Sequence, residues 1–82
     1  MVLPREKYAA TAECTVYKDQ EDGYAGDPYP LDAGTPLWAA VNDYETRILD
    51  GRVVQVVLLM VGGSDTWCLM PRDEFLRSTK KI

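Results

Sequence analysis

Acidic and aromatic side chains gather in one stretch of this 82-residue chain, and their chemistry suits binding. Residues 19–45 contain seven acids and no Lys or Arg, a charge of −7, whereas the other residues carry six acids and nine bases, a charge of +3. Tyrosines offer large contact areas at low entropic cost, and carboxylates beside them attract Arg and Lys and repel phosphates. We therefore expect a basic protein surface as the partner and no direct binding of nucleic acid. The candidate binding residues are Tyr17, Asp19, Glu21, Asp22, Tyr24, Asp27, Tyr29 and Asp32.

The residue types needed for catalysis are poorly represented. The chain contains no histidine, which excludes Ser–His and Cys–His nucleophile pairs and Cys₂His₂ zinc sites. Adjacent carboxylates, such as Asp73 and Glu74, lie in polar segments without the burial that tunes a catalytic acid. We expect no catalytic residue and no cofactor, and an enzyme would need a site assembled between copies of an oligomer.

One segment begins like a calcium-binding loop. Residues 19–23 resemble the start of an EF-hand, but the position that requires Gly holds Tyr24 and the position that requires a bidentate Glu holds Pro30. A solvated acidic loop explains the segment better, so no metal site is expected.

The two cysteines, Cys14 and Cys68, lie in strand-like contexts far apart in the chain. We expect two buried free thiols, and a disulfide would require neighbouring strands in matching register. Residues 1–7 have no apolar core of a signal peptide, and the longest apolar run, 53–61, is about half of what a membrane helix needs. The expected compartment is the cytoplasm.

The elements that must position the acidic stretch follow from alternation and turn residues. A chain of this length predicts one domain, 1–82. Residues 1–9 form an N-terminal arm in which Pro4 starts a helical turn, and residues 10–18 alternate as a half-buried strand. Residues 19–36 hold Gly and Pro at a density that predicts a long acidic loop without regular structure.

A tight hairpin follows this loop. Asp50-Gly51 lies between β-rich runs at 37–49 and 52–61, which predicts a type I′ turn that pairs Leu49 with Arg52 and Thr46 with Gln55. Asn42-Asp43 is a candidate bulge in the first run. Near the turn, the face with Glu45, Arg47, Leu49 and Arg52 is expected to be solvated.

The run Val53–Val61 is apolar on both faces away from the turn. Such a strand needs cover on both sides, which curvature of a small barrel or contact with a second copy would supply. Residues 62–65 then predict a turn, 66–70 a strand, and 71–76 a helical turn beginning at Pro71. Residues 77–82 form a last strand or a solvated basic tail.

This succession of elements resembles an SH3-like small barrel. Tyr17-Lys18-Asp19 opens a long acidic loop similar to the RT loop, Leu31 to Leu37 resembles the diverging turn, and Met70 to Leu76 resembles the closing segment. The resemblance implies a mostly β fold: an antiparallel barrel of about five strands with one short C-terminal helical turn. The proline-peptide motifs of eukaryotic SH3 domains differ here, because the first strand has only Tyr17 and the third begins Arg52-Val53-Val54.

Three functional hypotheses remain open. The leading one is a non-enzymatic module that docks a basic partner through the acidic, tyrosine-rich loop. The second is an acidic inhibitor or immunity-type protein, of the kind that mobile elements encode, whose carboxylates imitate nucleic-acid phosphates. The third is a structural homo-oligomer assembled through residues 53–61.

Overall fold

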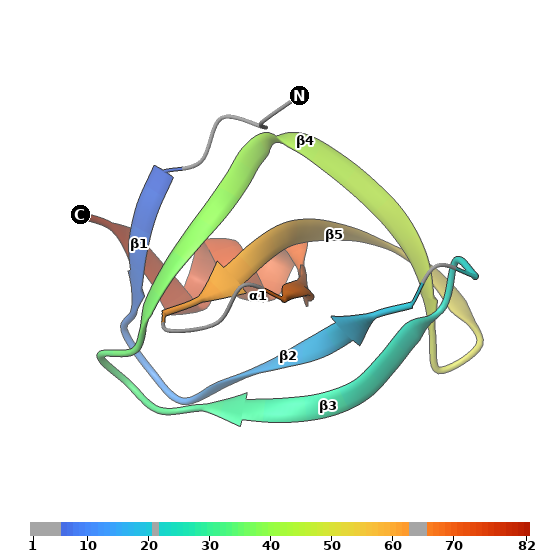
Figure 1. Ribbon diagram of the computed structural model, residues 1–82, viewed down its shortest axis with the longest axis horizontal. Coiled ribbons are helices and arrows are strands. Elements are labelled where there is room, and N and C mark those ends of the chain that lie inside the picture. The colour runs from blue at the N-terminus through green and yellow to red at the C-terminus, as the bar shows by residue number, and fades with distance from the viewer. Residues whose placement is uncertain (1–5, 21, 63–65) are drawn as a thin grey trace.

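Seven antiparallel strands and one short helix make up the described part of the chain (Figure 1). The computed structural model describes residues 6–20, 22–62 and 66–82, with the backbone alone described for 41–43. The mostly β prediction is confirmed. The elements are β1 (Glu6–Ala10), β2 (Cys14–Asp19), β3 (Ala25–Leu31), β4 (Pro36–Leu49), β5 (Arg52–Val61), β6 (Trp67–Pro71), α1 (Arg72–Ser78) and β7 (Thr79–Lys81).

The strands form one curved sheet in the order β3-β2-β6-β5-β4-β1-β7. β4 bends over the top of the view in Figure 1, the β2–β3 hairpin lies below it, and α1 lies behind. Within the described residues β3 and β7 each pair on one side only, so the sheet is open. The predicted five-strand barrel is therefore replaced by an open sheet with two further strands, β1 and β3, at sites where an arm and a loop were expected.

β3 lies inside the predicted loop 19–36. The expectation of no regular structure there is wrong, because Pro28 and Pro30 occupy an edge strand. The two prolines are two residues apart, so both nitrogens without hydrogen lie on the same side of the strand. β2 pairs with the other side, where Val16 lies opposite Tyr29. An edge strand therefore accepts prolines that a central strand would exclude.

The predicted N-terminal arm and its helical turn are also corrected, since residues 6–10 form β1 between β4 and β7. The strand expected over 10–18 is divided into β1 and β2 by an exposed bend at 11–13. Hydrogen bonds explain the division: Ala10 N–H donates to Thr35 O at 3.0 Å, and Thr11 N–H donates to Ser78 O at 2.8 Å. These contacts end β1 beside α1 and the start of β4.

The β4–β5 hairpin confirms the predicted turn and its register. Asp50 and Gly51 have φ values of 52° and 77°, as a type I′ turn requires. Leu49 pairs with Arg52 and Thr46 with Gln55. Between the pairs Ala40–Leu58 and Glu45–Val56 the register shifts, because four residues of β4 face one of β5. The bulge expected at Asn42-Asp43 is thus confirmed, and beyond it β4 bends.

Two apolar clusters cover the opposite faces of β5, whose residues 56–59 are all buried. Curvature within one chain therefore supplies the second cover that the sequence requires. The larger cluster contains Ala10, Cys14, Val16, Leu31, Leu37, Ala39, Val57, Leu59, Met70 and Phe75. The smaller contains Val56, Leu58 and Leu69, with Tyr17, Ala25, Val54 and Trp67 packed against it.

Near the turn of this hairpin, Arg52 is exposed as expected, but Arg47 on the same face is shielded and the opposite face is the more solvated one. Val53 is 74% exposed, whereas the Arg47 side chain is only 17% exposed. The β2 end folds onto the face with Arg47 and pairs with it through Asp19, which leaves Val53 and Gln55 outside. The long-range contact, and not the charge of the residues, decides which face is covered.

The C-terminal segment contains α1 and β7. Pro71 ends β6 and the helix follows with Asp73 and Glu74 in its first turn, where carboxylates interact favourably with the helix dipole. Phe75 is buried in the larger cluster and lies 4.9 Å from the Tyr8 ring between centroids. The predicted helical turn is confirmed as a seven-residue helix, and the last residues form a strand rather than a loose tail.

Candidate functional site

Five of the eight candidate residues lie exposed along the β2–β3 hairpin and the turns at its two ends. Tyr24 is 51% exposed and Tyr29 is 62% exposed, and no ion pair within the described residues uses the carboxylates that accompany them. We name this set the acidic tyrosine surface. It consists of Asp22, Tyr24, Asp27, Tyr29 and Asp32.

The other three candidates are not part of this surface. Asp19 Oδ1 lies 3.2 Å from Arg47 Nε, and Arg47 also approaches Glu45 at 3.7 Å. Tyr17 packs against the smaller apolar cluster; burial, followed by the charges of Glu74 and Asp50, raises its pKa. Both side chains therefore hold the hairpin against the rest of the sheet. Glu21 lies outside the described residues.

The turn that carries Tyr24 is fixed at two points. The Asp22 carboxylate accepts the Tyr24 N–H at 3.0 Å, and Gly23 O accepts the Ile48 N–H at 2.9 Å. The second contact forms a parallel bridge between Tyr24 and Ile48, so the turn is attached to β4 near the hairpin tip. Figure 1 shows this approach at the right of the molecule. Tyr24 is thus an exposed side chain on an anchored backbone.

β3 places Asp27 and Tyr29 on one face, because residues two apart in a strand share a face. Asp27 belongs to a bulge: Lys18 of β2 lies between the pairs Tyr17–Pro28 and Asp19–Ala25, opposite both Gly26 and Asp27. Gly26 is required there, since a Cβ at this position would lie 2.9 Å from Lys18 O. The bulge therefore sets the direction in which Asp27 and Tyr29 face.

Asp32 follows β3 in the turn that leads to β4. Its carbonyl accepts the Thr35 hydroxyl at 2.7 Å, and its carboxylate is exposed. Leu31 and Leu37, on either side of the turn, are both buried. Asp32 is therefore placed by a closed turn at one end of the surface and Asp22 at the other.

Basic residues lie at the other end of the strand order. Lys80 and Lys81 belong to β7, and Lys81 Nζ lies 3.1 Å from Glu6 Oε1. Lys7 on β1 approaches the Trp38 ring at 5.7 Å. Lys7, Lys80 and Lys81 therefore lie at the end of the strand order opposite to β3. Over the described residues no group of three or more potential metal ligands is found.

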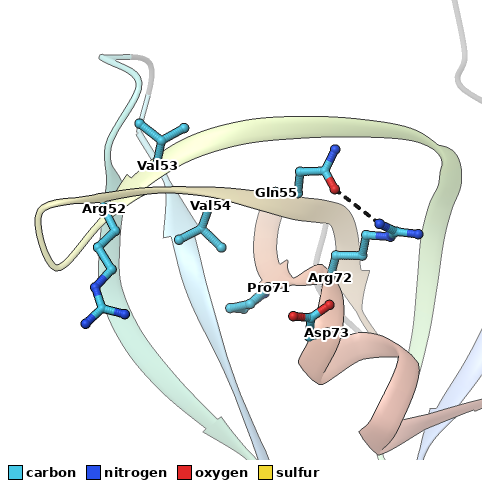
Figure 2. Close-up of a pocket in the computed structure, with 7 residues that line it drawn as sticks. All are labelled: Arg52, Val53, Val54, Gln55, Pro71, Arg72 and Asp73. Atoms are coloured by element: carbon cyan, nitrogen blue, oxygen red, sulfur yellow. Dashed lines mark hydrogen bonds between the residues drawn. The ribbon is translucent and has the colours of Figure 1, made fainter.

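A groove beside β5 was not identified by the sequence. It has a volume of about 380 Å³ and is lined by β5 residues 52–55 together with Pro71, Arg72 and Asp73. Figure 2 shows Arg52 and Val54 on one side of the strand and Val53 and Gln55 on the other, with Gln55 accepting a hydrogen bond from Arg72 Nη1 at 3.3 Å. One feature of the sequence indicates the groove: the segment that forms β5 is longer than the segment that forms β6, so β6 cannot pair with all of β5.

The cysteines are poor nucleophiles in this structure. Both are free, with Cys14 buried and Cys68 partly buried, as expected for structural thiols. Burial raises the pKa of each thiol, and the nearby carboxylates of Glu74 and Asp19 raise the pKa values of Cys14 and Cys68 further. The thiolate that would attack an electrophile is therefore disfavoured.

No protein-family model matches the chain, and neither a curated protein nor a solved structure matches it. In the described part of the chain, no helix has the length and apolar character needed to cross a membrane. The properties of the acidic tyrosine surface and of the groove are therefore the basis for a function.

Proposed function

We propose that this protein is a non-enzymatic interaction module whose acidic tyrosine surface docks on a basic surface of another protein. The observation that carries the proposal is the exposure of Tyr24 and Tyr29 beside carboxylates that form no ion pair among the described residues. Arg and Lys side chains pair with such carboxylates and stack on tyrosine rings, which combines charge selection with contact area.

Anchoring of the hairpin supports this function. The Gly23–Ile48 hydrogen bond and the Asp19–Arg47 ion pair hold the backbone under the exposed side chains. A backbone that is already ordered loses less conformational entropy when a partner binds. The interior contacts of Tyr17 and Asp19 therefore assist the surface without taking part in it.

The proposal keeps the SH3-like relationship and the cytoplasm as expectations. Five strands, β1, β4, β5, β6 and β7, follow one another with a tight hairpin after β4 and α1 before β7, and the β2–β3 hairpin occupies the place of the long loop. Two free thiols suit a reducing compartment.

The test begins with affinity capture of the partner from the native host, followed by binding measurements at several salt concentrations. Asp22→Lys together with Asp27→Lys should slow association and flatten its salt dependence, because exposed charges act mainly on the encounter rate. The matched control is Glu6→Lys with Leu76→Lys and Ile82→Lys, which changes the net charge equally at positions outside the surface on β1, on α1 and after β7. Unchanged binding by the Asp22 and Asp27 variant would refute the proposal.

The same measurements separate the phosphate-mimic hypothesis from docking on a protein surface. If DNA or RNA competes with this protein for the captured partner, the acids occupy a nucleic-acid site. The homo-oligomer hypothesis is tested by sedimentation over a range of concentrations. The burial of residues 56–59 within one chain leaves Val53 as the large apolar side chain that β5 exposes.

A further inference from the structure

One side of β5 has no neighbouring strand over its first four residues. β6 pairs with β5 from Met60 to Val56, where Pro71 lies opposite Val56. The chain then turns away into α1 at Arg72. Within the described residues, Arg52–Gln55 therefore pair with β4 on one side and with no strand on the other.

The backbone groups that face this open side belong to Val53. In a two-residue hairpin the closing pair, here Leu49 and Arg52, exchanges hydrogen bonds, and the direction of N–H and C=O alternates along each strand. Ile48 lies opposite Val53 and donates its N–H outward to Gly23 O, which agrees with this alternation. The N–H and C=O of Val53 are thus directed away from β4 into the open side, whereas those of Gln55 face Arg72, which follows the Val56–Pro71 pair.

The other open edges of the sheet carry features that oppose strand addition. On β3, Pro28 and Pro30 lack the donors that an added strand would need, and β7 has three residues, of which two are lysines. Residues 52–55 contain neither Pro nor Lys, and Val53 and Val54 favour extended structure. This edge is therefore the one best suited to accept a strand.

The groove provides room beside this edge and side chains of both charges. Figure 2 shows Arg52 at one end, Asp73 at the other, and Val54 and Pro71 between them. A second hollow of about 330 Å³ continues along Arg52 and Val54 toward Leu49 and Asp50. Arg52 forms no ion pair with any described residue, so its charge is available to a ligand.

We propose that the groove binds an extended peptide segment of another protein, which passes beside Pro71 and adds to β5 as an antiparallel strand opposite Arg52–Val54. The six strand pairs of the sheet are all antiparallel, and this direction runs the peptide from Asp73 toward Arg52. The segment carries an apolar residue opposite Val54 and Pro71, and an acidic residue two positions later beside Arg52. A basic residue near its amino end faces Asp73. This inference is independent of the acidic tyrosine surface.

The probe is a capped peptide that contains Lys-Thr-Val-Thr-Glu, and its control is the reversed order Glu-Thr-Val-Thr-Lys. Amide hydrogen exchange is measured by NMR on the whole chain with and without millimolar peptide. The expected result is slowed exchange at the Val53 amide, with little change at Val54, whose N–H already faces β4. The reversed peptide should protect the Val53 amide less, because it brings Glu to Asp73 and Lys to Arg52.

Two variants report on side-chain and backbone recognition separately. Arg52→Glu should weaken binding of the probe about fivefold and strengthen binding of a Lys-Thr-Val-Thr-Lys peptide by a similar factor. Val53→Pro removes the outward N–H donor and should weaken binding of the probe by about threefold to tenfold. Because Arg52 is exposed, its substitution leaves a folded protein even if the proline variant proves unstable.

Three results would overturn the proposal. The first is unchanged exchange at Val53 with saturating probe. The second is equal binding of the probe and its reversed control by the unaltered protein and by Arg52→Glu. The third is protection of the Val53 amide that depends on protein concentration without peptide, which would assign the edge to a second copy of this chain.

Discussion

β3 and the first part of β5 both leave one side of a strand unpaired, but they present different groups. β3 lacks donors at Pro28 and Pro30, and it exposes Asp27 and Tyr29. β5 exposes the backbone of Val53 beside Arg52. β3 thus presents acidic side chains on a backbone that lacks the donors for pairing with a further strand. The first part of β5 presents unpaired backbone groups next to the Arg52 cation.

The difference teaches that a small sheet can present two edges of different chemistry. A strand segment can form hydrogen bonds at β5 but not at β3, because β3 lacks the donors. Under the proposed function, a basic surface would be attracted to the acidic tyrosine surface and repelled by Arg52. The two proposals can therefore fail separately.

The largest change in the free energy of unfolding is expected from single proline substitutions at two adjacent positions of β5. Val54→Pro removes an N–H directed at β4 and should lower the free energy of unfolding by about 1–3 kcal/mol. Val53→Pro removes an outward N–H and should cost less than about 1 kcal/mol. Urea denaturation measures both. Equal losses would show that the edge at Val53 is not open, which would remove the contrast with β3.

The second largest effect is expected from the Asp19–Arg47 ion pair, which attaches the β2–β3 hairpin to β4. Asp19→Asn and Arg47→Met, combined in a double-mutant cycle, should give a coupling of about 1 kcal/mol, because both side chains are largely shielded. The Glu6–Lys81 pair, with side chains 40% and 61% exposed, serves as the control and should couple less. If the two couplings are equal, Asp19 belongs with the free carboxylates of the acidic tyrosine surface.

Alkaline pH should distinguish the inner side of the hairpin from its outer side. Burial raises the pKa of Tyr17 above its ordinary value of 10.0, so between the two pKa values the folded state retains a proton that the unfolded state has lost. Stability from this group is complete below pH 10 and declines as the pH rises above it. Tyr17→Phe should therefore lose less stability between pH 9 and pH 11 than the unaltered protein, as measured by guanidinium midpoints. An identical decline would contradict burial of the phenol.

The smallest effect concerns the exposed face of β3. Asp27→Asn and Tyr29→Thr should each change the free energy of unfolding by no more than about 0.5 kcal/mol, because neither side chain is buried. Thermal unfolding measures this. A loss above about 1 kcal/mol for Tyr29→Thr would show that its ring stabilises the fold, and the surface would then lose one of its two tyrosines.

The features that the sequence predicts well are those decided by neighbouring residues. Asp50-Gly51 adopts positive φ for local reasons, and the register from Leu49–Arg52 to Thr46–Gln55 follows from it. The helix after Pro71 is likewise signalled by the acids of its first turn. At these positions the types of the neighbouring residues are enough to predict the structure.

The features that the sequence misses depend on sheet order. Whether Pro28 can lie in a strand depends on β3 being outermost, and this is a property of the whole fold. The exposure of Val53 depends on the Asp19–Arg47 contact between distant segments. For the candidate surface, exposure of Tyr24 and Tyr29 fits a role in binding, whereas composition could not reveal that Asp19 and Tyr17 have partners inside the chain.

The position of β1 between β4 and β7 has a consequence for the order of events during synthesis. β1 is made early, but Ala10 pairs with Thr79, and Glu6 meets Lys81 across 75 positions of sequence. During synthesis, β1 therefore cannot pair with β7 until nearly the whole described chain has been translated. Contacts of such long range slow folding. Of the described strands, the one that leaves the ribosome first is thus among the last to be completed.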